Sequence, residues 1–313
     1  MIDRCNLRCT YCIQADKNVQ WLEKDKLMTF PEIKRVAQAA AGLGINQLRI
    51  TGGEPLVRPG VCDLISELKS IPGINRISMT TNGVLLNKYL NELEKAGLSS
   101  LNISLDTLDR AKFSRITQRN QYQTVVNTIK KARDTKIHVK INAVAIRGFN
   151  DNEIYDFVNF TINNDLTLRF IEFMPFSGNG WSPENVITAR DIFAIVKQQY
   201  DLIPEPPDHP SQTSRIYRIE GTGGRIGFIA SVTESFCQWC NRLRLTADGN
   251  LRTCLHCKIE TPLRQLLRNG ISDAALKKII VESVRMKQKE HVNFLNPNYL
   301  PLEDDREMIR IGG

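Results

Sequence analysis

Between Pro31 and about Tyr200, short apolar segments alternate with longer amphipathic ones at a spacing typical of consecutive βα units. The segments predicted as strands are Gln47 to Ile50, Arg76 to Thr80, Leu101 to Leu105, Val139 to Ile146 and Leu168 to Phe173. Those predicted as helices are Ile33 to Ala41, Asp63 to Lys69, Asn87 to Ala96, Val125 to Arg133 and Glu153 to Phe160. Repeated βα units require parallel strands with right-handed crossovers, so an α/β fold is predicted, as an open sheet or a full or partial barrel.

Four of the predicted strands end in a short cluster of polar residues or glycines. These clusters are residues 51–55 (TGGEP), 80–83 (TTNG), 104–106 (SLD) and 172–175 (EFMP). In parallel α/β folds the carboxyl ends of the strands form the ligand-binding face. The four clusters are therefore predicted to line one shared site.

The pattern changes after Tyr200, because prolines at positions 204, 206, 207 and 210 exclude a helix or a central strand. We therefore predict a βα domain over residues 1–203 and a C-terminal region over residues 204–313. The predicted elements of this region are a hairpin of residues 215–219 and 225–229, a second hairpin of residues 242–245 and 251–253, a helical segment over 262–290, and an irregular tail over 309–313.

Six of the eight cysteines fall in two triplets, Cys5, Cys9, Cys12 and Cys237, Cys240, Cys254. Clustering of this kind, in a chain with too few cysteines for a disulfide scaffold, indicates metal binding. Three thiolates can hold three irons of a four-iron cubane and leave the fourth iron open to a chelating molecule. The alternatives for the first triplet are a zinc site with a borrowed fourth ligand, or buried cysteines without a metal.

The second triplet has a stronger competing interpretation. Cys257 extends its spacing to C-x2-C-x13-C-x2-C, which is close to that of a four-cysteine zinc ribbon. This spacing alone leaves zinc and iron–sulfur equally open, and the first triplet favours iron and sulfur.

Two further segments are suited to ligands. The absence of Cβ atoms at Gly52 and Gly53 lets backbone groups approach a ligand closely, and Glu54 is placed to receive a ligand ammonium. On a strand, Arg242 and Arg244 share one face and form a plausible polyphosphate clamp. The alternative is a solvated edge strand that carries charge for solubility.

The chain carries 42 Lys and Arg against 34 Asp and Glu, a net charge of +8, which favours anionic ligands such as nucleotides, polyphosphates or nucleic acid. No segment approaches the roughly 20 apolar residues of a membrane span, and charged residues follow Met1 at once. These features predict a soluble protein of a reducing compartment with no membrane partner. The expected location is the cytoplasm, or an organelle if an upstream targeting segment is missing.

The motifs together resemble those of the radical S-adenosylmethionine (SAM) superfamily and, within it, the MoaA-type GTP 3′,8-cyclases of molybdenum cofactor biosynthesis. The likeness spans nearly the whole chain in order. It is carried by residues 3–12 (DRCN and the first triplet), 49–56 (RITGGEPL), 80–83 (TTNG), 102–106 (NISLD), 169–174 (RFIEFM), 236–244 (FCQWCNRLR) and 312–313 (GG). The fold that this resemblance implies is a partial, TIM-like βα barrel with a C-terminal extension that binds a second cluster.

The resemblance also implies roles for individual positions. Cys5, Cys9 and Cys12 would hold the [4Fe–4S] cluster that binds and cleaves SAM, with SAM contacted by Tyr11, Gly53, Ser104 and Met174. Cys237, Cys240 and Cys254 would hold a second [4Fe–4S] cluster whose open iron takes the guanine of GTP. The GTP site would be lined by Arg49, Thr80, Lys140, Arg242, Leu243 and Arg244, and a catalytic tail, Gly312 and Gly313, would thread into it.

The implied reaction is the conversion of GTP to (8S)-3′,8-cyclo-7,8-dihydroguanosine 5′-triphosphate. The 5′-deoxyadenosyl radical would remove hydrogen from the ribose 3′ carbon, and the substrate radical would attack guanine carbon 8. The implied partners are an external one-electron donor of the flavodoxin or ferredoxin type, a downstream cyclic pyranopterin monophosphate synthase, and a second copy of the chain in a homodimer.

Three features depart from the family pattern. A further strand with an arginine usually precedes the DRCN motif, and only Met1 and Ile2 do so here, which implies an open barrel edge and one missing phosphate contact. Gln47 replaces a frequent lysine, which weakens the phosphate clamp. Cys257 and His256 offer alternative ligands beside the second triplet.

Two other functions are compatible with parts of the sequence. The first is a radical SAM enzyme that acts on a peptide through an auxiliary cluster, and the arginine pair and the GTP-site residues argue against it. The second is a zinc-ribbon protein that binds nucleic acid. It leaves the first triplet unexplained and requires exposed aromatic residues, which are scarce at 7% of the chain, so no nucleic-acid partner is predicted.

Overall fold

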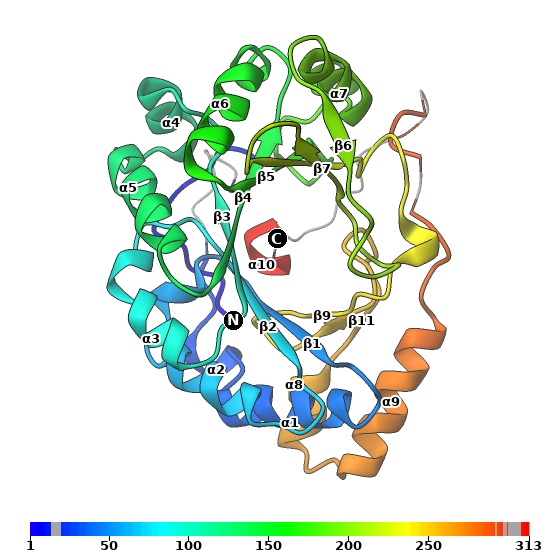
Figure 1. The fold of residues 1–313 in the computed structure, drawn as a ribbon. Coiled ribbons are helices and arrows are strands. Elements are labelled where there is room, and N and C mark those ends of the chain that lie inside the picture. Colours follow the sequence, from blue (N-terminus) through cyan, green and yellow to red (C-terminus); the bar gives the residue numbers. More distant parts are fainter. Residues whose placement is uncertain (14–19, 292, 297–298, 300–307, 313) are drawn as a thin grey trace.

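The computed structural model of the protein describes residues 1–13, 20–291, 293–296, 299 and 308–312. Its main element is an eight-stranded sheet in the order β1-β2-β3-β4-β5-β8-β7-β6, curved into an open arc with helices on its outer side (Figure 1). Its strands are β1 (Gln47–Ile50), β2 (Arg76–Thr81), β3 (Ser100–Ser104), β4 (His138–Ala145), β5 (Thr167–Glu172), β6 (Leu202–Pro204), β7 (Arg215–Ile219) and β8 (Arg225–Ile229). Strands β1 to β5 and β8 all run in parallel. Strand β7 pairs antiparallel with β8, and β6 pairs antiparallel with β7.

The α-helices of the arc connect its strands as the βα pattern predicts. They are α1 (Phe30–Ala41), α2 (Val61–Lys69), α3 (Leu90–Lys95), α4 (Arg110–Thr117), α5 (Tyr122–Arg133), α6 (Ile154–Asn164) and α7 (Ala189–Lys197). The five predicted strands are confirmed, and so are the predicted helices, although the segment from Asn87 to Ala96 divides into a 3₁₀ turn and α3. Helices α4 and α7 were not predicted.

The two faces of the sheet differ sharply in polarity. Met79, Leu101 and Val139 are in register on β2, β3 and β4, and all three lie buried against the helices. The next row on the same strands, Thr80, Asn102 and Lys140, faces the inside of the arc. A doubly wound sheet would bury both faces under helices and make both apolar, so this one-sided pattern is that of a barrel wall. The predicted partial barrel is therefore confirmed.

The C-terminal region begins by extending the same sheet. Strand β8 pairs in parallel with β5, and β7 returns along β8, so the first predicted hairpin is confirmed as part of the main sheet. The division of the chain at residue 203 stays a prediction, and the sheet is continuous across it.

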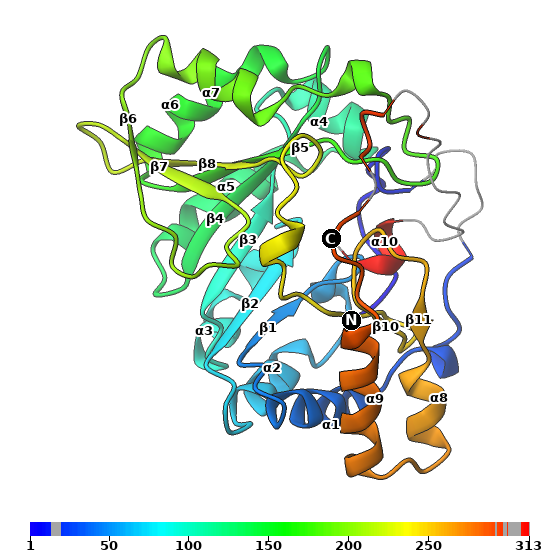
Figure 2. The ribbon, with the colours of Figure 1, turned by 90° about the vertical axis from the view of Figure 1, so that its right-hand side faces the viewer.

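The rest of the C-terminal region packs beneath the arc. It forms a small antiparallel sheet of β9 (Arg244–Leu245), β10 (Leu251–Arg252) and β11 (Glu260–Thr261), followed by α8 (Leu263–Arg268) and α9 (Asp273–Arg285). Figure 2 shows α9 beside α1. Leu276 and Ile280 of α9 share an apolar cluster with Val36 of α1. No helix in the described part of the chain is long and apolar enough to cross a membrane.

The C-terminal tail was predicted to be irregular over residues 309–313, and this prediction is wrong for residues 309–311. They belong to a short helix, α10 (Met308–Ile311), which lies inside the arc (Figures 1 and 2). Ile309 and Ile311 are each 3% exposed, and burial of these two side chains accounts for the ordered turn.

The N-terminal segment lies against the glycines that follow β1. The Gly53 N–H donates to the Ile2 carbonyl at 2.7 Å, and the Glu54 N–H donates to the Arg4 carbonyl at 2.9 Å. A Cβ atom on Gly53 would lie 2.3 Å from the Arg4 carbonyl oxygen, and one on Gly52 would lie 2.5 Å from the Ile2 carbonyl oxygen. Both glycines are therefore required by the segment that leads into the first cysteine triplet.

We expect the Gly53→Ala variant to displace this segment, at a cost of about 1–3 kcal/mol typical of overpacking. The free energy of unfolding, measured with urea, checks this. The matched control is Gly42→Ala, because the new Cβ there would meet only the flexible end of the Lys277 side chain, with Nζ at 2.8 Å. A Gly53→Ala protein as stable as the control would contradict the close approach.

Candidate active site

The first cysteine triplet lies on a loop that hydrogen-bonds to the end of α4. The Arg8 and Thr10 N–H groups each donate at 2.9 Å to carbonyls at the end of α4, those of Thr117 and Ile116. Within the loop, the Cys12 N–H donates to the Cys9 carbonyl at 2.9 Å. The loop is thus fixed beside the carboxyl ends of the strands, where the sequence predicts the ligand face.

The cluster of polar residues after β2 contacts the first cysteine directly. The Asn82 Nδ2 donates to the Cys5 Sγ at 3.5 Å and to the Asn6 Oδ1 at 2.8 Å. The Leu7 N–H donates to the same sulfur at 3.4 Å. Donors of this kind stabilise a thiolate ligand and tune an iron–sulfur cluster.

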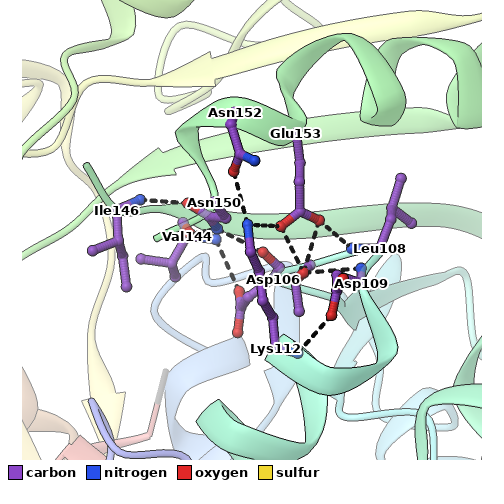
Figure 3. Close-up of polar contacts among 10 residues, drawn as sticks. Asp106, Leu108, Asp109, Lys112, Val144, Ile146, Asn150, Asn152 and Glu153 are labelled. Atoms are coloured by element: carbon purple, nitrogen blue, oxygen red, sulfur yellow. Dashed lines mark hydrogen bonds and ion pairs between the residues drawn. The ribbon is translucent and has the colours of Figure 1, made fainter. Parts of the chain in front are cut away.

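Tyr11 anchors the loop to the end of β3. Its hydroxyl donates to the buried Asp106 carboxylate at 2.6 Å, and the other Asp106 oxygen accepts from the Val144 N–H at 2.9 Å. Asn150 donates to the Asp106 carbonyl at 2.5 Å and to the Val144 carbonyl at 2.8 Å (Figure 3). This network ties the ends of β3 and β4 together under the cysteine loop.

A second part of the same network fixes the start of α4. The buried Glu153 carboxylate accepts from the Thr107 hydroxyl at 2.7 Å, from the Leu108 N–H at 2.6 Å and from the Lys112 Nζ at 2.8 Å (Figure 3). Since α4 carries the carbonyls that hold the cysteine loop, Glu153 supports the loop from below.

The surroundings of the first triplet favour protonated thiols unless a cation binds the sulfurs. Burial raises the pKa of Cys5, and burial together with Cys12 and Asp106 raises that of Cys9 well above the usual range. A bound metal centre reverses this preference, because its charge favours the deprotonated sulfur.

Glu54 connects two strand ends of the site. Its side chain is 1% exposed, and it accepts from the Leu56 N–H at 3.0 Å, the Thr81 hydroxyl at 2.8 Å and the Asn82 N–H at 2.7 Å. Burial raises its pKa to about 7 against these hydrogen bonds. Glu54 therefore joins the ends of β1 and β2, and a contact with a ligand ammonium stays a prediction.

The residues predicted to contact SAM lie at the carboxyl ends of the strands. Tyr11 and Met174 line one small cavity together with Val144 and Met308. Ser104 ends β3, and Gly53 follows β1. The sequence did not indicate Met308, which reaches this cavity because α10 folds back into the arc.

The predicted GTP-site cations line the inside of the arc. Arg49 on β1 contacts the Ser78 hydroxyl at 3.4 Å, and Lys140 on β4 is in register with Asn102, which is in register with Thr80. Arg169 on β5 also points inward. Its guanidinium donates to the Asn102 Oδ1 at 2.5 Å and to the Asn142 Oδ1 at 2.6 Å.

These inward-facing cations lower one another's pKa values. Burial lowers the pKa of Lys140 to about 8, with Arg169 adding to the effect. Burial and then Arg49 lower the pKa of Arg169 to about 9. Burial and then Arg242 lower the pKa of Arg49. Cations that repel one another inside the arc destabilise the unliganded protein, and a polyanion would relieve that repulsion.

The C-terminal region closes the site with the segment from Arg242 to Arg244. Arg244 is half-buried, and desolvation followed by Arg242 and Arg49 lowers its pKa to about 10. Its guanidinium also donates to the Gly312 carbonyl. A Cβ atom on Gly312, which has φ +85°, would lie 3.2 Å from the Thr51 Cγ2. Gly312 thus lies between Arg244 and the turn after β1. Gly313 lies outside the described residues.

The second triplet lies on two loops next to these arginines. Cys237 and Cys240 flank a 3₁₀ turn, where the Cys240 N–H donates to the Cys237 carbonyl at 3.1 Å, and Cys254 follows β10. Burial raises the pKa of Cys240, but Arg242 and Lys287 outweigh it and lower the pKa to about 7. This environment favours a thiolate ligand.

The two alternative ligands at the second triplet have surroundings of their own. Cys257 is 4% exposed, and its sulfur accepts from the Ile259 N–H at 3.4 Å. The His256 ring packs against Phe176 and Phe294, with ring centroids 5.3 and 4.7 Å apart. Burial, then His291, lowers the pKa of His256 to about 3, so the ring is neutral.

Sequence reasoning did not identify Arg169, Asn102 and Asn142 as residues of the site. The signal available was the period-2 alternation of β3, β4 and β5, which places all three on the polar face once the register is known. The register depends on tertiary pairing, so the sequence pattern alone could not align them.

We expect the affinity for inorganic tripolyphosphate to fall as the pH rises above about 8. The pKa of Lys140 lies near 8 in the free protein, and a bound anion raises it, so binding takes up a proton there. The dissociation constant should rise by up to about tenfold per pH unit, as one linked proton requires. Calorimetric titration in two buffers measures the uptake. Lys140→Met should abolish it and the exposed Lys136→Met should retain it; equal uptake in both variants would refute the assignment.

The chain matches two family models that together span most of its length. The model described as the radical SAM superfamily matches residues 1–161, and the one described as Molybdenum Cofactor Synthesis C matches residues 166–293. Membership of the radical SAM superfamily implies a [4Fe–4S] cluster and SAM.

Several named proteins are similar to the chain along its length. The GTP 3′,8-cyclase of Clostridium perfringens is 42% identical over 314 residues, covering 100% of this chain and 95% of that protein. The mitochondrial GTP 3′,8-cyclase of Arabidopsis thaliana is 41% identical over 314 residues, covering 100% and 80%. Molybdenum cofactor biosynthesis protein 1 of Drosophila melanogaster is 42% identical over 294 residues, covering 94% and 52%. The chain spans about half the length of this last protein and of its similar relatives from Caenorhabditis elegans and Dictyostelium discoideum.

Solved structures support the fold alone. SuiB of Streptococcus suis, bound to its precursor peptide SuiA, has a TM-score of 0.52 at 20% identity and covers 62% of this chain and 43% of that chain. Methylornithine synthase has a TM-score of 0.51 at 18% identity and covers 63% and 59%. The family models and the sequence identities above, by contrast, show that the chain belongs to the GTP 3′,8-cyclase family of the radical SAM superfamily.

Proposed function

We propose that the protein is a GTP 3′,8-cyclase that converts GTP to (8S)-3′,8-cyclo-7,8-dihydroguanosine 5′-triphosphate in the first step of molybdenum cofactor biosynthesis. The observation that carries this proposal is the set of mutually repelling cations that line the inside of the arc, close to a loop with three cysteines. A triphosphate is the complement of such a set, because its charges are compact and accept several hydrogen bonds at once.

The first site would hold a [4Fe–4S] cluster on Cys5, Cys9 and Cys12. When bound, this cluster and SAM supply the 5′-deoxyadenosyl radical that removes hydrogen from the ribose 3′ carbon before that carbon attacks guanine carbon 8. Tyr11 and Met174 border the cavity proposed for SAM, and Gly53 and Ser104 would contact SAM from the ends of β1 and β3.

The protein's own contribution is to position two ligands and exclude water. Arg49, Lys140 and Arg244 would grip the triphosphate, with Arg242, Leu243 and Thr80 beside them. Positioning of this kind lowers the barrier because the reacting carbons are held close together before the radical forms. The hydrogen bond from the Arg244 guanidinium to the Gly312 carbonyl supports a role for the tail, Gly312 and Gly313, in shaping this site.

A second [4Fe–4S] cluster on Cys237, Cys240 and Cys254 belongs to the same proposal, with its open iron on the guanine of GTP. The lowered pKa of Cys240 supports a thiolate ligand there. Cys257 shares a loop with Cys254 and is the remaining candidate ligand. A structural zinc at this place would require all four sulfurs about 2.3 Å from one ion.

The other functions considered have less support. A nucleic-acid binder requires cations on an exposed surface, whereas Arg169 is only 8% exposed and lies inside the arc. The likeness to SuiB concerns the fold and adds no support for a peptide substrate.

The proposed partners follow from the proposed reaction. Reductive cleavage of SAM needs a one-electron donor, of the flavodoxin or ferredoxin type, and the cyclic product would pass to cyclic pyranopterin monophosphate synthase. Assembly as a homodimer and a cytoplasmic or organellar location stay predictions.

We expect the Cys5→Ser variant to abolish SAM cleavage, because the cluster would lose one of its three protein ligands. The measurement is 5′-deoxyadenosine formation with dithionite, together with iron and sulfide per chain. Wild-type protein should hold about eight irons and the variant about four. The control is Cys62→Ser, since Cys62 is half-buried in α2 and away from both triplets. Persistent cleavage in Cys5→Ser would refute the assignment of the first triplet.

We expect Arg244→Ala to weaken GTP binding by about 10- to 100-fold, as loss of charge-assisted hydrogen bonds to phosphate predicts. Equilibrium binding of GTP measures this, and the iron content should stay unchanged. Arg215→Ala is the matched control, because Arg215 is 73% exposed in a surface ion pair with Glu234. Unchanged GTP affinity in Arg244→Ala would exclude the phosphate clamp.

A further inference from the structure

Lys287 lies at the second cysteine triplet although it is 47 positions away from Cys240 in the sequence. Its ammonium donates to the Cys240 carbonyl at 2.9 Å, to the Cys240 Sγ at 3.4 Å and to the Arg242 carbonyl at 2.9 Å. An ammonium has three donors, so these three bonds use all of them. None of the three goes to a carboxylate, and the sulfur is the only acceptor among them that can carry a negative charge.

The position of this ammonium is set by a rigid part of the fold. Lys287 follows the end of α9, and its own N–H donates to the Val284 carbonyl at 3.0 Å. Helix α9 is fixed to α1 through Leu276, Ile280 and the ion pair between Arg35 and Asp273 at 2.8 Å. The Lys287 side chain therefore projects from a packed helix end toward a loop that has little regular structure.

We propose that Lys287 is a positioning residue for the second cluster and for the phosphate-binding arginines at the same time. Its bonds to two carbonyls hold the backbone from Cys240 to Arg242, which connects a cluster ligand to the arginine pair. Its bond to the sulfur places a positive charge on one ligand of the cluster. The inference rests on the second cluster of the proposed function and deepens it.

The charge has a defined electrochemical effect. Reduction adds negative charge to a cluster, and donors to its sulfur ligands stabilise the reduced form and raise its reduction potential. Removal of the ammonium should therefore make the potential of the second cluster more negative. It should also release the Arg242 carbonyl and weaken GTP binding.

The test compares Lys287→Met, Lys287→Arg and Lys289→Met in the full chain, reconstituted anaerobically. Lys289 is exposed and close in sequence, so it controls for the loss of one surface charge. The readouts are iron per chain, the dissociation constant of GTP, and the midpoint potential of the second cluster. The potential is measured by redox titration with electron paramagnetic resonance, with Cys5, Cys9 and Cys12 replaced by serine in each chain.

We expect Lys287→Met to shift the midpoint potential to more negative values and to raise the GTP dissociation constant by about tenfold or more. The midpoint potential of Lys287→Arg should stay close to that of the wild type, because arginine retains the positive charge. A midpoint potential and GTP affinity in Lys287→Met equal to those of Lys289→Met would overturn the inference.

Loss of the second cluster is also informative. If Lys287→Met loses about four irons, retention of the cluster in Lys287→Arg supports the inference, and its loss in both variants overturns it. Wild-type chain with only about four irons would refute the second cluster itself. Eight irons in the wild type, with no change in Lys287→Met, would refute only the role of Lys287.

Discussion

The parallel register of β2 to β5 is the constraint on which the rest of the structure depends. It places Met79, Leu101 and Val139 in one row against the helices and Thr80, Asn102 and Lys140 in the next row inside the arc. A slip by one residue would turn the polar row into the core and the apolar row into the cavity. The same register brings the carboxyl ends of the strands to one edge, where the first cysteine loop is held.

This arrangement has an energetic cost that points to the ligand. Arg49, Lys140, Arg169 and Arg244 line the inside of the arc, and their pKa values are all lowered, first by desolvation and then by neighbouring cations. Such repulsion opposes folding and is retained where function requires it. The repulsion between these cations in the unliganded barrel therefore favours the binding of a polyanion, beside the turn that carries Gly53.

Both cysteine triplets are positioned by contacts from outside their own segments. The first is held by Asn82 after β2, by Asp106 after β3 and by the end of α4. The second is held by Lys287 at the end of α9. The sulfur ligands lie on short loops that local sequence does not make rigid, and packed helices and strand ends supply the rigidity. The C-terminal region thereby joins the wall of the barrel, its phosphate-binding arginines and its second cysteine site.

The sequence by itself determined the βα fold and the two cysteine triplets, because hydrophobic periodicity and residue spacing are local properties. It predicted Arg242 and Arg244 on one strand, whereas β9 begins only at Arg244. Tertiary structure alone decided how Glu54 is held, because strand pairing buries its carboxylate against the Asn82 N–H. It also decided the course of the tail, because burial of Ile309 and Ile311 turns an irregular segment into α10. Arg169 and Lys287 joined their sites only through strand register and helix packing, which bring together residues far apart in the chain.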